Sequence, residues 1–254
     1  MKGAGTSRAL RVFARINCRL PQTCAKLHNT QARGIRFGGC GATEACYLLK
    51  KANGRVEFLH RAPGQPLHVS ILPGAFNPVT VAHLALARAA LAQVDEVVFV
   101  LPRRFPHKEY TGAGFEARAA LLMALAVGSP SYSVASAEGG LFIEIARESR
   151  AAYGGNVRVS MLCGRDAAER IVDWDYGMPG AIEEMLREFG LLVAARRGEY
   201  AALSNLAHAI GRLELDGEFD HVSASEVRRR IAAGAAWEHL VPAAVRDQVR
   251  KLYG

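Results

Sequence analysis

Thr80 and His83 carry a hydroxyl group and an imidazole three residues apart, at the start of a helix pattern that follows an apolar run. Side chains at this spacing lie one helical turn apart and project from the same face. The small-residue turn before them, residues 73–79, leads into the helix N-terminus, where exposed N–H groups and the helix dipole attract anions. The segment therefore predicts a binding site for an anionic ligand. Considered in isolation, His83 could equally cap its own turn.

A second group of polar residues lies near the C-terminus, where Ser223 and Ser225 precede an amphipathic helix pattern that contains Arg228. Ser225 is a suitable N-cap, and hydroxyl groups, backbone amides and a guanidinium can converge there on a phosphate group. The alternative is a plain helix cap with solvated Arg229 and Arg230 beside it. That alternative explains the cap but not its pairing with the first segment.

The elements that must position these residues form an alternating pattern. Short apolar runs, rich in β-branched residues, alternate with longer stretches of helical period. Strands that are apolar on both faces and alternate with helices predict an α/β fold, a doubly wound parallel sheet, with ligands at the carboxyl ends of its strands. The apolar runs are 67–72, 97–101, 157–163 and 191–195, and the helical stretches are 81–93, 115–127, 140–152, 180–188 and 202–213.

The net charge of +8 is concentrated at the N-terminus of the 254-residue chain. Residues 1–43 contain eight Lys or Arg and no acidic residue, whereas 24 residues of each sign follow. The basic excess therefore does not predict a nucleic-acid-binding face on the folded domain. No apolar run approaches the roughly 18 residues that a membrane-spanning helix needs, so no membrane partner is expected. Pro63, Gly64 and Pro66 indicate a linker, which predicts a poorly structured extension over 1–65 and one domain over 66–254.

Within the extension, residues 8–20 place basic and apolar side chains in two stripes of helical spacing. That pattern is typical of an organellar transit peptide, and the alternative is an unstructured leader. We expect a cytoplasmic protein, with an organellar location as the alternative. The cysteine pairs Cys18/Cys24 and Cys40/Cys46 are spaced too widely for the tight turn of a structural zinc site, so no protein-bound metal is expected. Assembly into a homo-oligomer is left open.

The string Gly-x-Phe-x-Pro-x-Thr-x-x-His, at residues 74–83, resembles the first motif of the nucleotidylyltransferase superfamily. Residues 222–228 are similar to that superfamily's Ile-Ser-Ser-Thr-x-x-Arg signature, with Ala224 in place of its second Ser and Ser225 in place of its Thr. The resemblance implies a Rossmann-like fold. It also implies that His83 contacts the α-phosphate of ATP, that Thr80 positions phosphate, and that Arg228 and the serines hold the β and γ phosphates. The residues that it assigns to ATP are Gly74, Phe76, Asn77, Thr80, His83, Ser223, Ser225 and Arg228.

Two further strings resemble the nicotinate-nucleotide adenylyltransferases within that superfamily. His107 and Lys108 follow Pro106, as in that family's Pro-His-Lys loop, where the lysine reaches a substrate phosphate. Asp166 and Trp174 have the spacing of its Gly-x-Asp-x7-Trp element, which implies that Asp166 lies on the nucleotide side of the cleft and that Trp174 stacks near the pyridine ring. The alternatives are that Trp174 is a core residue and that Asp166 caps the next helix.

The resemblance implies transfer of AMP from ATP to the phosphate of nicotinate or nicotinamide mononucleotide, with release of pyrophosphate, in NAD biosynthesis. Mg²⁺ would bridge the substrate phosphates and need few or no protein ligands. Two departures leave alternatives open. Ala82 replaces the glycine of Thr-x-Gly-His, and Gly139-Gly140 replaces a Ser-Tyr-Thr element at the acceptor. The alternatives are another phosphomonoester acceptor, of the phosphopantetheine or cytidylyltransferase type, and a degenerate nucleotide-binding module.

Overall fold

A computed structural model describes residues 55–104, 112–174, 179–194 and 200–254. Residues 1–54, which make up most of the predicted extension, lie outside this part of the chain. No helix within the described ranges is both long and apolar enough to cross a membrane.

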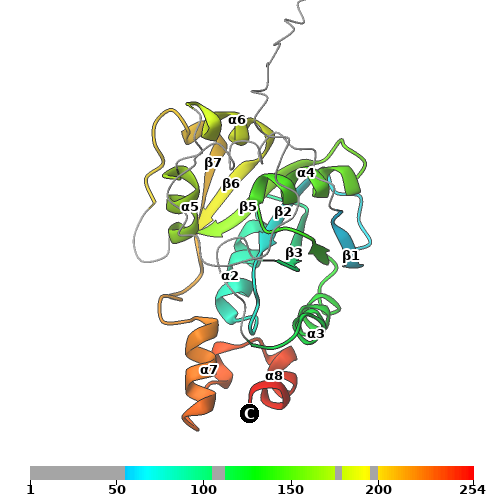
Figure 1. Ribbon diagram of the computed structural model, residues 1–254, viewed down its shortest axis with the longest axis vertical. Coiled ribbons are helices and arrows are strands. Elements are labelled where there is room, and N and C mark those ends of the chain that lie inside the picture. Colours follow the sequence, from blue (N-terminus) through cyan, green and yellow to red (C-terminus); the bar gives the residue numbers. More distant parts are fainter. Residues whose placement is uncertain (1–54, 105–111, 175–178, 195–199) are drawn as a thin grey trace, which may run out of the picture. The chain divides into compact units, whose positions relative to one another are not determined.

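Within the described residues, seven strands form one mixed sheet in the order β1-β4-β3-β2-β5-β6-β7 (Figure 1). All neighbouring strands are parallel except β1, which pairs antiparallel with β4. The predicted parallel, doubly wound sheet is therefore confirmed, with an antiparallel strand added at one edge. The strands are β1 Glu57–His60, β2 His68–Pro73, β3 Glu96–Pro102, β4 Tyr132–Ala137, β5 Arg158–Gly164, β6 Gly190–Ala194 and β7 Ile210–Leu213.

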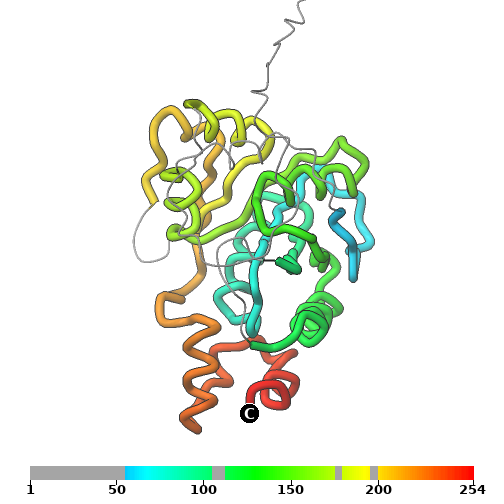
Figure 2. Tube along the Cα trace, in the orientation of Figure 1, coloured from blue at the N-terminus to red at the C-terminus, as the bar shows by residue number. Residues whose placement is uncertain are grey.

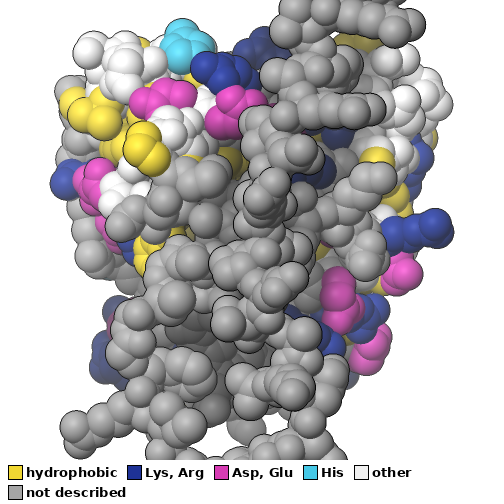
Figure 3. Space-filling model, turned by 45° about the horizontal axis from the view of Figure 1, so that its top comes forward, with side chains coloured by type: hydrophobic (Ala, Val, Ile, Leu, Met, Phe, Trp, Pro, Cys, Tyr) yellow, Lys and Arg dark blue, Asp and Glu magenta, His cyan; other side chains and the backbone are white. Residues whose placement is uncertain are grey.

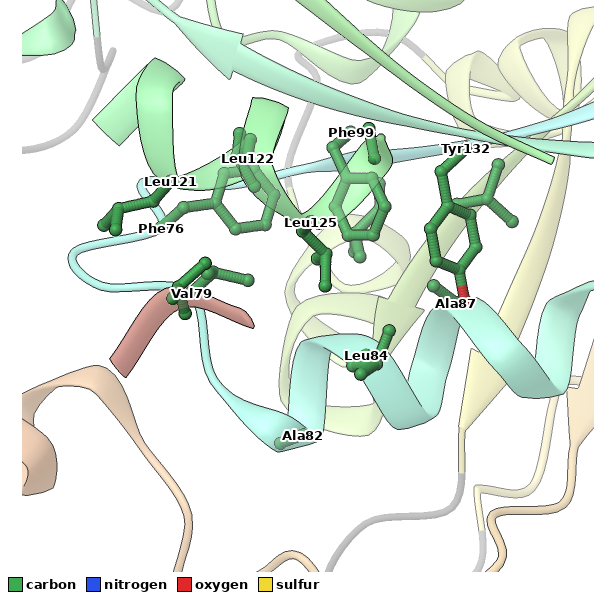
Figure 4. Close-up of a cluster of buried hydrophobic side chains, with 14 of the residues drawn as sticks. Phe76, Val79, Ala82, Leu84, Ala87, Phe99, Leu121, Leu122, Leu125 and Tyr132 are labelled. Carbon is green, nitrogen blue, oxygen red and sulfur yellow. The ribbon is translucent and has the colours of Figure 1, made fainter. Parts of the chain in front are cut away.

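Helices cover both faces of the sheet because side chains alternate between its two faces. In β3, Phe99 packs on the side of α2, α3, α7 and α8, whereas Val98 and Val100 pack on the side of α4, α5 and α6. Figure 4 shows the first of these clusters, with Phe99 facing side chains of α2 and α3. The α-helices are α2 Val81–Ala90, α3 Phe115–Ala126, α4 Phe142–Ala152, α5 Arg165–Val172, α6 Ala181–Glu188, α7 Ala224–Ala232 and α8 Arg246–Tyr253, and the 3₁₀ turns are η1 Ala207–Ala209, η2 Glu238–Leu240 and η3 Ala243–Val245.

The winding direction of the sheet reverses beside β2. From β2 the chain proceeds outward through β3 to β4, and then crosses to β5 on the other side of β2 and continues through β6 to β7. After β7 it passes to α7 and α8, which lie side by side at the C-terminus (Figure 2). In folds of this kind the crevice at the carboxyl ends of the two strands flanking the reversal is the usual ligand site.

The structure differs from the sequence-based expectation at three places. The predicted helix over 202–213 is wrong, because this segment forms the short turn η1 and the strand β7, which pairs with β6. The sheet also includes residues 57–60, which precede the predicted domain start at residue 66. The strand β4 was not among the predicted elements.

Charged side chains in the described part of the chain are arranged locally in pairs of opposite sign. Arg147 of α4 donates from Nε to Glu188 Oε2 of α6 at 2.7 Å, which links two helices on the same face of the sheet. Basic and acidic side chains also lie next to one another on the face shown in Figure 3. This arrangement agrees with the even balance of charge after residue 43.

Candidate active site

A cleft of about 500 Å³ opens where the winding of the sheet reverses. Its base is formed by the carboxyl ends of β2, β5 and β6, at Pro73, Gly164 and Ala194. Residues of both predicted motif segments line it, although about 140 positions separate them in the chain. The predicted site residues that line the cleft are Phe76, Asn77, Thr80, His83, Ser223, Ser225 and Arg228.

Thr80 and His83 are joined by hydrogen bonds at the N-terminus of α2. Thr80 is the N-cap, and its backbone N–H donates to His83 Nδ1 at 3.1 Å. Thr80 Oγ1 lies 2.8 Å from the same nitrogen. Because a backbone N–H can only donate, Nδ1 is the acceptor, and the proton of the neutral imidazole is on Nε2. His83 does therefore cap its own turn. Its Nε2 is the ring nitrogen that can donate a hydrogen bond to a ligand.

The buried side chain of Phe76 packs against the turn that contains Thr80 and His83. It is 1% exposed and has a positive φ of 46°, which turns the chain sharply before α2. Its ring contacts the His83 imidazole edge to face, at a centroid distance of 5.2 Å, and the Phe99 ring at 5.8 Å. Gly74 fits beneath this ring, since a Cβ there would lie 3.0 Å from Phe76 Cζ. Figure 4 shows Phe76 directed into the core, toward Leu121 and Leu122 of α3.

The second motif begins helix α7. Ser223, not Ser225, is the N-cap, and its Oγ accepts a hydrogen bond from the backbone N–H of Glu226 at 3.1 Å. The prediction of Ser225 as cap is wrong by two residues, because the helix begins at Ala224. This shift leaves the Ser225 hydroxyl within the first turn of the helix, where it lines the cleft.

Arg228 is the only Lys or Arg among the described residues that line the cleft. Its guanidinium donates to the carbonyl oxygen of Asn77 and lies 3.4 Å from Ser225 Oγ. The neighbouring Arg229 and Arg230 instead bind the carboxylate of Glu226, and their hydrogen bonds lower the pKa of Glu226 to about 2. The cleft therefore receives one guanidinium from this helix, held in place by the opposite turn.

The remaining wall of the cleft is apolar and carries no negative charge. Phe142, Leu162 and Phe219 line it, and its described residues include no Asp or Glu. Cys163 also lines it, but burial raises the pKa of this thiol to about 12, which keeps it neutral. N–H donors, hydroxyl groups and a guanidinium beside an apolar surface suit a ligand that combines phosphates with a flat organic group.

Comparison with known proteins identifies the family. Residues 71–230, more than half of the chain, match the family model described as cytidylyltransferase-like. The chain belongs to this nucleotidylyltransferase family. A probable nicotinate-nucleotide adenylyltransferase from Bordetella avium (strain 197N) is 32% identical over 189 residues, which cover 70% of this chain and 92% of that protein. Another, from Citrifermentans bemidjiense, is 28% identical over 211 residues, which cover 73% of this chain and 96% of that protein.

The fold of this nucleotidylyltransferase is also similar to a solved structure. A Plasmodium falciparum nicotinic acid mononucleotide adenylyltransferase complexed with APC superimposes with a TM-score of 0.57 and 16% sequence identity. The match covers 72% of this chain and 94% of that chain. At this level of identity the similarity establishes the fold alone.

Two other predicted site residues of this nucleotidylyltransferase, Asp166 and Trp174, are not among the described residues that line the cleft. Asp166 is an exposed residue in the first turn of α5, whose N-cap is Gly164, so the alternative of Asp166 as cap is wrong. Trp174 follows α5 and is 45% exposed, so the alternative of a core residue is wrong as well. Their roles toward an acceptor remain predictions. His107 and Lys108 lie outside the described residues.

Two residues that hold the first turn were missed by the sequence analysis. Arg118 of α3 is 3% exposed and donates from Nη1 to the carbonyl oxygen of Ala75 at 2.8 Å. Tyr253 of α8 donates from its hydroxyl to Asn77 Oδ1 at 2.5 Å. An arginine in a helix pattern ordinarily indicates a solvated face, and a tyrosine near the C-terminus carries no motif, so neither residue gave a usable signal.

Proposed function

We propose that this nucleotidylyltransferase moves AMP from ATP to the phosphate of nicotinate mononucleotide and releases pyrophosphate. The observation that carries the proposal is that the His83 turn and the Arg228 turn line one cleft where the winding of the sheet reverses. The acceptor is supported by relatives 26–32% identical to the chain that are named probable nicotinate-nucleotide adenylyltransferases.

In the proposed reaction a phosphate oxygen of the acceptor attacks the α-phosphorus of ATP. A new P–O bond forms, and the bond from that phosphorus to the bridging oxygen breaks, with its electron pair leaving on pyrophosphate. Such transfers need little covalent catalysis by the protein. They are accelerated by holding two anions in line and by stabilising the charge on the transferred and leaving oxygens.

The geometry supports separate roles for the two turns that line the cleft. His83 donates from Nε2 to the α-phosphate, while Thr80 fixes its ring through Nδ1. Across the cleft, the Arg228 guanidinium and the hydroxyl of Ser225 bind the β and γ phosphates, with Ser223 ordering the helix terminus beneath them. The donors are placed before the reaction begins, which is the condition for efficient electrostatic stabilisation.

The donor set also suits Mg²⁺ carried by ATP. The described cleft residues offer no carboxylate, and no three His, Cys, Asp or Glu side chains cluster as a metal site within the described ranges. Magnesium would therefore be held by phosphate oxygens and water, where it neutralises phosphate charge. The protein contributes the donors of the His83 and Arg228 turns.

A pyrophosphate-release assay tests the function. The purified protein is supplied with MgATP and, separately, nicotinate mononucleotide, nicotinamide mononucleotide or phosphopantetheine, and with CTP and a phosphorylated alcohol. We expect pyrophosphate only with a pyridine mononucleotide and its loss in His83→Ala. Release with another acceptor alone would favour a different transferase of this family. ATP binding without release from any acceptor would identify a degenerate nucleotide-binding module.

A further inference from the structure

The turn between β2 and α2 is held by hydrogen bonds from three helices that follow it in the chain. Arg118 of α3 binds the carbonyl oxygen of Ala75, and Arg228 of α7 binds that of Asn77. The third contact comes from α8, where the Tyr253 hydroxyl donates to Asn77 Oδ1 at 2.5 Å. Asn77 is thus the residue at which contacts from α7 and α8 meet.

The Tyr253 hydroxyl is one of the groups that hold the Asn77 side chain. The Asn77 side chain is 5% exposed, so its polar atoms need protein partners. Its Oδ1 also accepts from the backbone N–H of Ala113, but at 3.4 Å, which is longer than a typical N–H···O bond. The Tyr253 hydroxyl therefore makes the stronger of these two bonds. Arg228 binds the backbone carbonyl of the same residue, so the Tyr253 bond helps to fix the backbone at that carbonyl.

We propose that Tyr253 is a positioning residue for nucleotide transfer, acting through Asn77 on the phosphate-binding turn and on Arg228. The inference rests on the proposed use of ATP by this cleft. Tyr253 lies outside both motif turns and is not among the residues that line the cleft. It affects rate because preorganised donors lose much of their effect when they are displaced by a fraction of an ångström.

Removing only the hydroxyl leaves the helix in place. The Tyr253 ring packs against the core cluster shared with α2 and α3, and α8 is anchored by Val249, which is fully buried together with Val245 just before the helix. Tyr253→Phe keeps the ring and loses the hydrogen bond to Asn77. We therefore expect the variant to fold, with a Tm no more than about 4 °C below that of the parent protein.

Tyr153→Phe is the matched control. The Tyr153 hydroxyl donates to Glu96, the first residue of β3, at the end of the strand opposite to the cleft. In steady-state assays Tyr253→Phe should lower kcat/KM for ATP about tenfold and change KM for the acceptor by less than about twofold. Tyr153→Phe should lower Tm and leave both kinetic constants unchanged. Equal kinetics in the parent and Tyr253→Phe would overturn the proposal.

A double-mutant cycle tests whether Tyr253 acts through Asn77. In an Asn77→Ala background, Tyr253→Phe should change kcat/KM for ATP by less than about twofold, because the acceptor of its hydroxyl has gone. An undiminished tenfold loss would show that the hydroxyl acts by another route. If Asn77→Ala does not fold, hydrogen exchange of Tyr253→Phe decides, and amides 75–80 should exchange faster than in the parent or in Tyr153→Phe.

The outcome can be separated from failure of the proposed function. If no acceptor in the panel supports turnover by the parent protein, the proposed reaction is wrong. Calorimetry with MgATP and the exchange of amides 75–80 then test Tyr253 directly, with a rise in Kd of about fivefold expected in Tyr253→Phe. Unchanged ATP affinity together with unchanged exchange would refute the positioning role.

Discussion

Arg228 donates a hydrogen bond to the carbonyl oxygen of Asn77, although 151 positions separate the two residues in the chain. The bond joins the first turn of the domain to the helix α7 across the cleft. The same guanidinium lies 3.4 Å from Ser225 Oγ, so it is held by both sides of the cleft. A planar group fixed in this way presents its remaining N–H donors in a defined direction.

Arg228→Ala should reduce kcat/KM for ATP about 100-fold or more, because in the proposed reaction Arg228 is a preorganised donor to the charge that develops on the leaving phosphates. Arg228→Lys keeps the positive charge but loses the planar, forked guanidinium, so its kcat/KM for ATP should lie between those of the parent protein and Arg228→Ala. Steady-state kinetics with varied ATP provide the measurement. Arg229→Ala is the control, since the neighbouring side chain is 68% exposed and paired with Glu226. A comparable loss in Arg229→Ala would contradict a specific role for Arg228.

His83 should be replaced more successfully by glutamine than by asparagine. The Thr80 N–H donates to Nδ1, which leaves Nε2 as the ring nitrogen that would donate to phosphate in the proposed reaction. The amide nitrogen of glutamine reaches about as far as Nε2, whereas that of asparagine reaches about as far as Nδ1. We expect His83→Gln to retain a measurable part of the kcat that His83→Asn and His83→Ala lose. Equal residual rates in all three variants would show that donation from Nε2 is not what matters.

The sequence predicts the buried strands well where both faces are apolar, as in β3. It misses β4 because Ser133 and Ser136 interrupt the apolar pattern, yet both are buried in the sheet. Ser133 Oγ donates to Glu96 at 2.5 Å and accepts from the Ala62 N–H at 2.8 Å, and these partners are 37 and 71 positions away. Tertiary hydrogen bonds thus satisfy polar groups that local pattern assigns to the surface.

In residues 202–213 the sequence predicts a helix where the structure has a short turn and the strand β7. The alanine-rich composition of this segment favours a helix, but residues 210–213 form a strand because β6 offers an open edge for pairing. In the site, both motif turns could be located from their spacing, since turn and cap residues act locally. The contacts of Arg118 and Tyr253 with the first turn could not, because they depend on how α3 and α8 pack.

A chain that begins at residue 66 should be less stable than one that begins at residue 55. The longer chain retains β1, the buried Val56 and the bond from Ala62 to Ser133. Their loss should cost about 2–4 kcal/mol and leave β4 as an open edge. Thermal unfolding and light scattering of both chains measure the difference. Identical Tm values would mean that β1 contributes nothing to the stability of the domain.

His68 should make stability depend on pH below neutrality. Burial, followed by the nearby charge of Arg158, lowers the pKa of His68 below its ordinary value of about 6.5. Between the two values the unfolded chain binds more protons, so stability is complete above about pH 6.5 and falls as the pH decreases toward the folded-state value. Urea unfolding should show that the free energy of unfolding decreases less between pH 7 and pH 5 in His68→Gln than in the parent protein.

Gly112→Ala should damage the site through Asn77. Gly112 has φ +136°, a backbone conformation that other residues rarely adopt, and a Cβ there would lie 2.2 Å from Asn77 Nδ2. The added methyl must displace the amide that Tyr253 holds, so we expect kcat/KM for ATP to fall about tenfold and Tm to decrease. Gly155→Ala isolates the backbone term, since Gly155 has φ +89° but no atom lies within 4 Å of the position that a Cβ would take there. Gly155→Ala should lower the free energy of unfolding by about 1–2 kcal/mol and leave kcat/KM for ATP unchanged. Equal kinetic losses in the two variants would mean that backbone strain, rather than displacement of Asn77, slows the reaction.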